Sequence, residues 1–344
     1  MGRSAMFLVM GLGMALAMIG FNINKTGSQA VEVQMGYMKY ANARNLANTA
    51  VHAGLRALDR GNGMPLTAVS YNSGTYIVTD TSSNVDTLFI NTRGTYAEST
   101  YTMRLKLFFD TKPFPMPNAA IGIRATPVSF SMTGAGCEVN GNNWTADGSA
   151  LTGSGNLPGV TTMTAADSST VYAAGSGRIN GTVAVAKDTN TPNPGTYINE
   201  YIANADYTFS TGTVSGNQTF GSASNPVIVV CDSPADTNFR IRFSGNVTGY
   251  GILAVRGSLQ VGGTFEWFGL VVCFGESNTV DFGGNGTPSI VGGLIVAQPG
   301  AGSASLQLKG SGNRGKVKYS SAAIRNARNI GKLKYYRVLS WYEQ

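Results

Sequence analysis

Residues 5–21 read AMFLVMGLGMALAMIGF, a run of seventeen residues without a charged side chain. As an α-helix this run spans about 25 Å at about 1.5 Å per residue, which is near the shorter limit for crossing the hydrocarbon core of a bilayer. Arg3 is the only charged residue before it. Because basic residues stay on the cytoplasmic side, we expect the N-terminus to face the cytoplasm and the rest of the chain to be exported.

Three interpretations fit this run: a cleaved signal peptide, a lone membrane anchor, or a helix that leaves the membrane to pack against copies of itself. Ala15-Leu16-Ala17 offers a small-residue cleavage site for the first. The third is favoured by methionines that recur every four residues on one helical stripe and by small residues that allow two helix backbones to approach closely. The residues that we predict to pack in a filament core are Met6, Met10, Gly11, Gly13, Met14, Ala15, Ala17 and Met18.

The pattern changes after this run. Residues 22–28, NINKTGS, are polar, and Asn22, Asn24 and Gly27 are poor helix formers, so we expect the helix to loosen at this joint. Helical character returns over residues 29–58, with apolar side chains along one face. The glycines and the proline that follow end the helix.

Strand patterns dominate after residue 65. TYIVT at 75–79, TLFI at 87–90 and YTMRLKLFF at 101–109 are rich in β-branched and aromatic residues, which predicts strands. We expect an antiparallel sheet that covers the apolar face of the second half of the helix. The three prolines of KPFPMP at 112–117 indicate a boundary. Residues 118–225, rich in Gly, Ser, Thr and Asn, indicate short strands and long loops.

Two apolar patterns then alternate along the chain. The first reads PVIVV at 226–230, GILAV at 251–255, GLVVC at 269–273 and GLIVA at 293–297; the second reads SLQVGG at 258–263, TVDFGG at 279–284 and SLQLKG at 305–310. Two short strands in a period of about 20 residues predict a β-solenoid, in which each coil stacks on the one before it. An ordinary antiparallel sandwich is the alternative.

Two of the three cysteines, Cys231 and Cys273, close such apolar strands, and the third is Cys137. If coils stack in sequence order, one coil separates Cys231 from Cys273, which places them about 9.6 Å apart at about 4.8 Å per coil. A disulfide requires Cα atoms within about 7 Å. The two cysteines are also the sixth and fifth residues of their patterns, which predicts opposite faces, so we expect no bond between them.

These patterns together predict an α+β protein: a long N-terminal helix with an apolar first half, a small antiparallel sheet packed on it, and a Gly-rich solenoid-like domain. The predicted segments are 1–60 (helix, with halves 5–21 and 29–58), 61–117 (sheet), 118–225 (loop-rich β region), 226–310 (repeats) and 311–344 (basic C-terminal segment).

Basic residues gather near the C-terminus, in a chain with a net charge of +7 in which only 12% of residues are charged. The residues that we predict to form a basic interface are Lys309, Arg314, Lys316, Lys318, Arg325 and Arg328. The sequence has no recognised nucleic-acid motif, so we favour a seam between subunits or a surface-binding strip over specific nucleic-acid binding.

Candidate catalytic chemistry is sparse. The chain has 18 acidic residues and one histidine, His52, and it contains no HExxH, GxSxG or Walker A motif. A polysaccharide-degrading β-helix enzyme, the alternative from another class, would need converging carboxylates, for which Glu266 and Glu276 are the nearest candidates. We therefore expect no enzyme activity, no catalytic residues, no cofactor and no metal site.

The whole arrangement resembles the type IV pilin superfamily, most closely its large PilX-like pilus assembly proteins with a β-solenoid element. The similar stretches are GRSAMFLVMGLGMALAMIGF (2–21), ARNLANTAVHAGLRAL (43–58), INTRGTYAESTYTMRLKLFF (90–109), GYGILAVRGSLQVGGTFEWFGLVVCFGE (249–276) and YRVLSWYE (336–343). The resemblance implies insertion in the inner membrane, then assembly by the pilus machinery into an extracellular homo-oligomeric filament with the helices at its core.

Two features depart from that family. Gly2, the position that resembles the family's processing glycine, precedes Arg3 instead of a hydrophobic residue, and no acidic residue occurs before Glu32. The sequence therefore fits a major pilus subunit and a minor one equally. The alternatives are a membrane-anchored surface β-solenoid protein and a minor adhesin at a filament tip.

Overall fold

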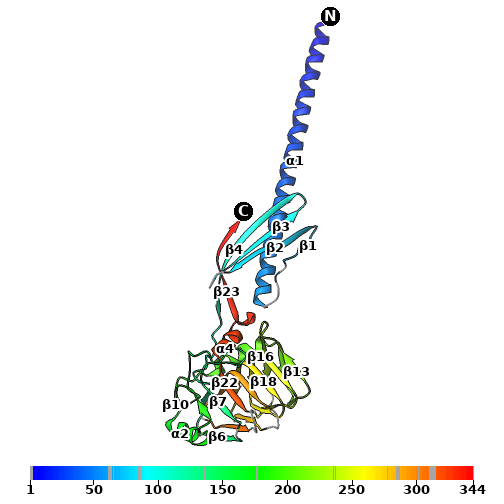
Figure 1. Ribbon diagram of the computed structural model, residues 1–344. Helices are drawn as coiled ribbons and strands as arrows, with labels where there is room; N and C mark the ends of the chain where they lie inside the picture. Colours follow the sequence, from blue (N-terminus) through cyan, green and yellow to red (C-terminus); the bar gives the residue numbers. More distant parts are fainter. Residues whose placement is uncertain are drawn as a thin grey trace. The chain divides into compact units, whose positions relative to one another are not determined.

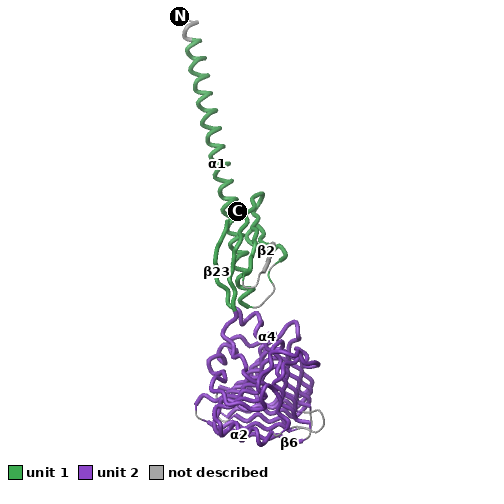
Figure 2. Tube along the Cα trace, turned by 60° about the vertical axis from the view of Figure 1, so that its left-hand side comes forward, with its two compact units in different colours: residues 1–110, 335–344 green, residues 111–334 purple. Residues whose placement is uncertain are grey.

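The computed structural model describes residues 3–60, 64, 66–83, 87–134, 136–175, 177–234, 236, 238–276, 278–283, 287–300, 302–309 and 315–343; the side chains of 3–5 and 79–83 lie outside this description. The chain forms two compact units (Figure 2): unit 1 comprises residues 1–110 and 335–344, and unit 2 comprises residues 111–334. A long N-terminal helix followed by sheets confirms the predicted α+β class.

Helix α1 (Arg3–Asp59) runs without interruption through the expected joint, as Figure 1 shows. The prediction that Asn22, Asn24 and Gly27 loosen the helix is therefore wrong for this structure. Helix propensity is a weak preference that costs about 1 kcal/mol at most per such residue, and the backbone bonds continue across it. The Thr26 hydroxyl also donates a hydrogen bond of 2.8 Å to the Asn22 carbonyl oxygen within this stretch.

The second half of α1 packs on a five-stranded sheet in unit 1. The strands are β1 (Val69–Tyr71), β2 (Gly74–Ser83), β3 (Thr87–Tyr96), β4 (Ser99–Thr111) and β23 (Lys334–Glu343), in the order β1-β2-β3-β4-β23, and β1 to β4 are antiparallel. Ala43, Ala47 and Val51 of the helix are buried against Ile90 and Met103 of the sheet. Small helix residues at the contact let α1 lie close to the strands.

The last strand, β23, is tied to α1 by a charged contact. The Arg44 Nη2 atom donates to both carboxylate oxygens of Glu343, at 2.7 and 3.0 Å, and the Tyr101 hydroxyl donates to the Glu343 Oε2 atom at 2.8 Å. The C-terminus thus completes the sheet of unit 1. The predicted segment 311–344 is not a separate segment, because residues 311–334 belong to unit 2 and residues 335–344 to unit 1.

This contact predicts a pH-dependent contribution to stability. Hydrogen bonds from Arg44 and then Tyr101 lower the pKa of the Glu343 carboxyl, so its contribution is present above the unfolded-state pKa of about 4.3 and is lost as the pH falls through the lower folded-state pKa. We expect Glu343→Gln to lower the melting temperature of the full chain in detergent at pH 7, with a difference that shrinks toward pH 2. Circular dichroism melts across this pH range measure it.

Glu98→Gln is the matched control for that experiment, because the Glu98 side chain is 92% exposed and lies 3.7 Å from the Lys39 ammonium group. We expect this control to melt like the parent at every pH. A Glu343→Gln difference that stays constant from pH 7 to pH 2 would contradict the ionic contribution.

Unit 2 is built from parallel strands in two sheets, and the chain alternates between them. The twelve-stranded sheet contains β14 (Val227–Cys231), β16 (Val247–Val255), β18 (Phe265–Phe274) and β20 (Ser289–Ala297), and the six-stranded sheet contains β15 (Arg240–Phe243), β17 (Ser258–Val261), β19 (Asn278–Phe282) and β21 (Ala304–Lys309). Each strand pairs in parallel with the next of its own sheet. We call a strand of the larger sheet, together with the strand of the smaller sheet that follows it, one coil.

The observed register moves the start of the first repeat pattern by one residue in two of its four copies, to Val227 and to Gly292. Gly251 lies beside Val227 in one direction and beside Gly269 in the other, and Gly269 lies beside Gly292. The expected starts were residues 226 and 293. At this position φ is positive, +118° at Gly251, +138° at Gly269 and +144° at Gly292, so each long strand turns a corner here that favours glycine.

The segment 118–225 supplies strands to both of these sheets, although the sequence indicated a separate loop-rich region. β5 (Ile121–Arg124) and β6 (Val128–Thr133) pair with β20 and β21 at one end of the stack, while β11 (Tyr207–Phe209) and β12 (Thr213–Val214) pair with β14 and β15 at the other.

The remaining elements of unit 2 are β7 (Glu138–Asn140), β8 (Val160–Thr162), α2 (Ala165–Ala174), β9 (Ile179–Asn180), β10 (Val185–Lys187), α3 (Ile198–Ala203), β13 (Gln218–Phe220), β22 (Lys316–Tyr319) and α4 (Ser321–Arg328), with 3-10 turns at Pro194–Thr196 and Gly331–Leu333.

The strands of the larger sheet are apolar on both faces. Leu253, Val271 and Leu294 point into a core that the smaller sheet shares, whereas Ile252, Leu270 and others on the opposite face pack with residues of α3 and α4. Burial on both faces explains why the repeats read as continuous apolar runs without polar alternation.

Cys231 and Cys273 have Val255 between them in the register, and all three side chains belong to the same core. The expected stacking order therefore holds, but the expected opposite faces are wrong, because the first pattern starts at Val227. All three cysteines are unpaired and buried. Burial raises the pKa of the Cys231 and Cys273 thiols, which lowers their reactivity.

We therefore expect thiol counting to distinguish the folded from the unfolded chain. Under denaturing, non-reducing conditions three free thiols should react, and in the folded protein Cys231 and Cys273 should react at least about a hundredfold more slowly than a free thiol. Mass spectrometry of peptides after alkylation measures both. A peptide that joins Cys231 to Cys273 would contradict the stacking order.

Candidate functional site

The candidate site is the first half of α1, whose side chains have no cover within the described part of the chain. From Met6 to Ile23 every large apolar side chain is exposed, by between 54% at Ile19 and 76% at Phe7. They are Met6, Phe7, Leu8, Val9, Met10, Leu12, Met14, Leu16, Met18, Ile19, Phe21 and Ile23. A patch of this kind marks a membrane or a protein interface. Because the apolar side chains surround the helix, cover is required on every side.

The small residues of this segment also have no packing role inside the described chain. A Cβ atom added at Gly11, Gly13 or Gly20 would meet nothing within 4 Å among the described residues. A glycine in a helix interior lowers the stability of the helix by about 1 kcal/mol relative to alanine. Among the described residues of one chain, no contact of these glycines offsets that loss. Such glycines allow a second helix to approach closely.

The length of the uncharged segment also fits a bilayer. Residues 4–24 contain no Asp, Glu, Lys or Arg, and as a helix they span about 31 Å, against about 30 Å for a hydrocarbon core. By length and composition the helix can cross a membrane, and none of its most apolar window is buried. Signal sequences near an N-terminus share these properties.

The structure places all eight predicted filament-core residues on this exposed part of α1, from Met6 to Met18. Met6, Met10, Met14 and Met18 follow one another at four-residue steps of a regular helix, as the spacing indicates. Their packing against other copies stays a prediction. Val31, Val33 and Met35 are exposed as well, although the apolar face of residues 29–58, which includes Val31 and Met35, was expected to be covered by the sheet. That expectation is wrong for this part of the helix, because the cover begins only further along α1, where Ala43, Ala47 and Val51 are buried.

The predicted basic interface is spread over several elements of unit 2. Lys309 ends β21, Lys316 and Lys318 lie on β22, and Arg325 and Arg328 lie on α4; Arg314 lies outside the described residues. Because these positions lie on three different elements, the predicted basic residues do not form one strip along a single strand or helix.

Lys318 and Arg328 contact other residues of unit 2. The Lys318 ammonium group lies 3.8 Å from the centre of the Trp144 ring and donates to the Gly148 carbonyl oxygen at 2.8 Å. Burial lowers the pKa of Lys318. Arg328 donates through Nε to the Thr111 hydroxyl at 2.9 Å. These contacts lie within unit 2, and a role of the predicted basic residues in a seam stays a prediction.

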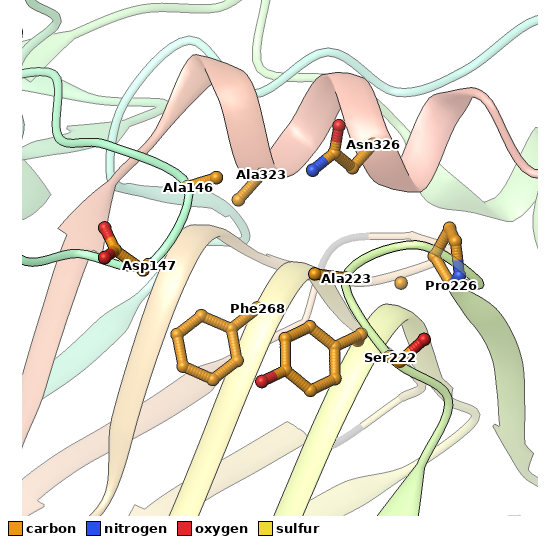
Figure 3. A pocket seen from close by; sticks show the side chains of 10 residues that line it. Ala146, Asp147, Ser222, Ala223, Pro226, Phe268, Ala323 and Asn326 are labelled. Atoms are coloured by element: carbon orange, nitrogen blue, oxygen red, sulfur yellow. The ribbon is translucent and has the colours of Figure 1, made fainter.

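Unit 2 also has a cavity of about 160 Å³ above β16 and β18. Figure 3 shows Phe268 on one side of the cavity and Ala323 and Asn326 of α4 on the opposite side. Tyr250 also lines the cavity. The two rings are stacked, with centres 4.8 Å apart. Each aromatic residue directly precedes a corner glycine in its repeat, and this is the sequence signal by which the cavity could have been found.

Asp147 is the one carboxylate among the residues that line this cavity. Hydrogen bonds from Thr145 and Ser149 lower its pKa to about 2, so it stays ionised and lacks an acidic partner with which to share a proton. Glu266 and Glu276, the candidate pair from the sequence, are exposed and stand near opposite ends of β18. Among the described residues no group of three His, Cys, Asp or Glu is placed to hold a metal ion.

Comparisons with known proteins add little. No family model matches the chain, and no curated protein matches it. Among solved structures, the competence-associated pilin ComZ from Thermus thermophilus is similar over 89% of this chain and 98% of ComZ, at 10% sequence identity and a TM-score of 0.25. A similarity of this degree leaves the function to be argued from the chain's own residues.

Proposed function

We propose that the chain is a structural subunit of an extracellular, type IV pilus-like filament, which the first half of α1 anchors in the membrane before assembly. One observation carries the proposal: an uncharged helical segment whose apolar side chains are exposed on all sides, directly continuous with a helix half that is buried in unit 1. Such a segment needs either lipid or other helices around it.

The same segment can serve both environments in turn. In the membrane its apolar side chains contact lipid, and in a filament they contact the helices of other copies, where burial is worth about 25 cal/mol per Å² relative to water. A contact between different faces of identical copies generates a filament when its rotation does not close a ring. Pilus assembly machinery would supply the transfer from membrane to filament.

Unit 2 is then the displayed part, and we infer that its parallel coils are a β-solenoid. We also propose that the chain has no enzyme activity. The isolated, ionised Asp147 and the separation of Glu266 from Glu276 support this, because hydrolysis of glycosides needs two carboxyl groups on either side of the bond that breaks. Activity on a panel of polysaccharides that Asp147→Asn abolishes would contradict it.

Electron microscopy of material sheared from the producing cells tests the filament proposal. With gold-labelled antibodies against unit 2, we expect label along regular fibres. If the label stays in the membrane fraction and the sheared material contains no labelled fibre, the chain is a lone membrane-anchored surface protein and the proposal is wrong. Label confined to fibre ends would indicate a minor subunit at the tip.

A further inference from the structure

The charges of α1 follow a seven-residue spacing. Lys25, Glu32 and Lys39 are the charged residues between Arg3 and Arg44. The continuity of α1 through residues 22–28 gives this spacing a geometric meaning, because seven residues of unbroken helix rise about 10.5 Å and turn the side chain by only about 20° from its starting direction. The three charges therefore lie along one side of the helix in the order plus, minus, plus.

These charges lack strong partners inside the chain. Among the described residues no ion pair involves Lys25 or Glu32, and Lys39 has a loose pair, 3.7 Å long, with the almost fully exposed Glu98. The side chains around them are apolar and exposed, among them Ile23, Val31 and Val33. An interface that covers these apolar groups also removes the charges from water, which is unfavourable unless each charge meets its opposite.

We propose that neighbouring parallel copies of α1 contact each other with an axial stagger of one heptad, about 10.5 Å, fixed by ion pairs between their charges. This inference rests on the proposed filament and names the register of its helices. At this stagger Lys25 of one copy is level with Glu32 of the next, and Glu32 of the first is level with Lys39 of the next. Both of these pairs are opposite in charge.

The other alignments are disfavoured by the same three residues. Parallel copies in register place Lys25, Glu32 and Lys39 each beside its own counterpart, which gives three like-charge pairs. A stagger of two heptads places Lys25 beside Lys39. Only the shift of one heptad gives two favourable pairs, so the charge order selects it against its neighbours.

The glycines of α1 accommodate the same stagger. Gly13, Gly20 and Gly27 are also seven residues apart, and a Cβ atom at each would meet nothing within 4 Å among the described residues. They lie on a different side of the helix from the three charges. A shift of one heptad in the same direction brings Gly13 level with Gly20 of the next copy and Gly20 level with Gly27, so a contact on that side of the helix keeps glycine opposite glycine.

Charge reversal in the full chain tests the stagger, with filaments sheared from cells as the readout. Glu32→Lys places like charges at both pairs, and we expect at least a tenfold loss of filament. The triple variant Lys25→Glu, Glu32→Lys, Lys39→Glu reverses every charge and restores both pairs, so we expect it to recover filament to within about threefold of the parent. Thr26→Lys adds a charge on a side of α1 that carries neither the three charges nor the glycines, and it is the control, with a yield expected near that of the parent.

Images of the parent filament give a second measurement, since electron cryomicroscopy resolves the axial offset between contacting helices. We expect about 10.5 Å. An offset near zero, normal assembly of Glu32→Lys, or a triple variant no better than Glu32→Lys would overturn the stagger while leaving the filament in place. A parent that forms no filaments at all would overturn the proposed function, and the stagger with it.

Discussion

Replacing Leu12 by arginine should abolish filament formation. Leu12 lies near the middle of the uncharged segment and is 61% exposed in the single chain, so in the proposed filament it is surrounded by other helices. An arginine at the centre of an apolar helix costs about 3 kcal/mol even on lenient insertion scales, which is more than a hundredfold at about 1.4 kcal/mol per tenfold. The measurement is the filament yield in sheared material, counted by electron microscopy.

A loss of filament is informative only if the rest of the chain folds. Unit 2 is formed from residues 111–334, far from residue 12 in sequence, so its circular dichroism spectrum and melting temperature should match those of the parent. Thr26→Arg is the matched control, because it puts the same residue on α1 outside the uncharged segment and away from the glycine side. If Leu12→Arg assembles as well as this control, the segment is not the core of a filament.

The second large effect is expected from Gly269→Ala, which should destabilise unit 2 by about 3 kcal/mol or more. The φ angle of Gly269 is +138°, and strain of this kind costs about 1–3 kcal/mol for a residue with a side chain. The new Cβ atom would also overlap the carbonyl oxygen of Gly251 in the neighbouring coil, and overpacking of this kind adds about 1–3 kcal/mol.

We expect the melting temperature of unit 2 to fall by roughly 10 °C, since 1 kcal/mol corresponds to roughly 2–4 °C for a domain of this size. Thermal unfolding followed by the fluorescence of the fully buried Trp267 measures it. Gly300→Ala is the control, because a Cβ atom there meets nothing within 4 Å among the described residues. Equal melting temperatures for the two variants would contradict the corner role of Gly269.

The sequence alone predicted the two halves of α1 and the alternation of strands in unit 2. Both rest on local periodicity: an uncharged apolar run of bilayer length, and apolar strands separated by glycines at intervals of about 20 residues. It wrongly predicted a joint at Asn22, Asn24 and Gly27, because helix propensities of about 1 kcal/mol per residue do not decide whether a long helix continues. The continuity matters, since it aligns Lys25, Glu32 and Lys39 along one side.

Only the tertiary structure decided how distant segments combine. The pairing of β5 and β6 with β20 and β21 and the attachment of Glu343 to Arg44 join residues far apart in sequence, and no local pattern encodes such partners. The register of the coils was also decided there: Gly269 faces Gly292, although Gly293 begins a run of similar letters. The physical reason is steric, because the position beside a neighbouring carbonyl oxygen has a positive φ and has no space for a side chain.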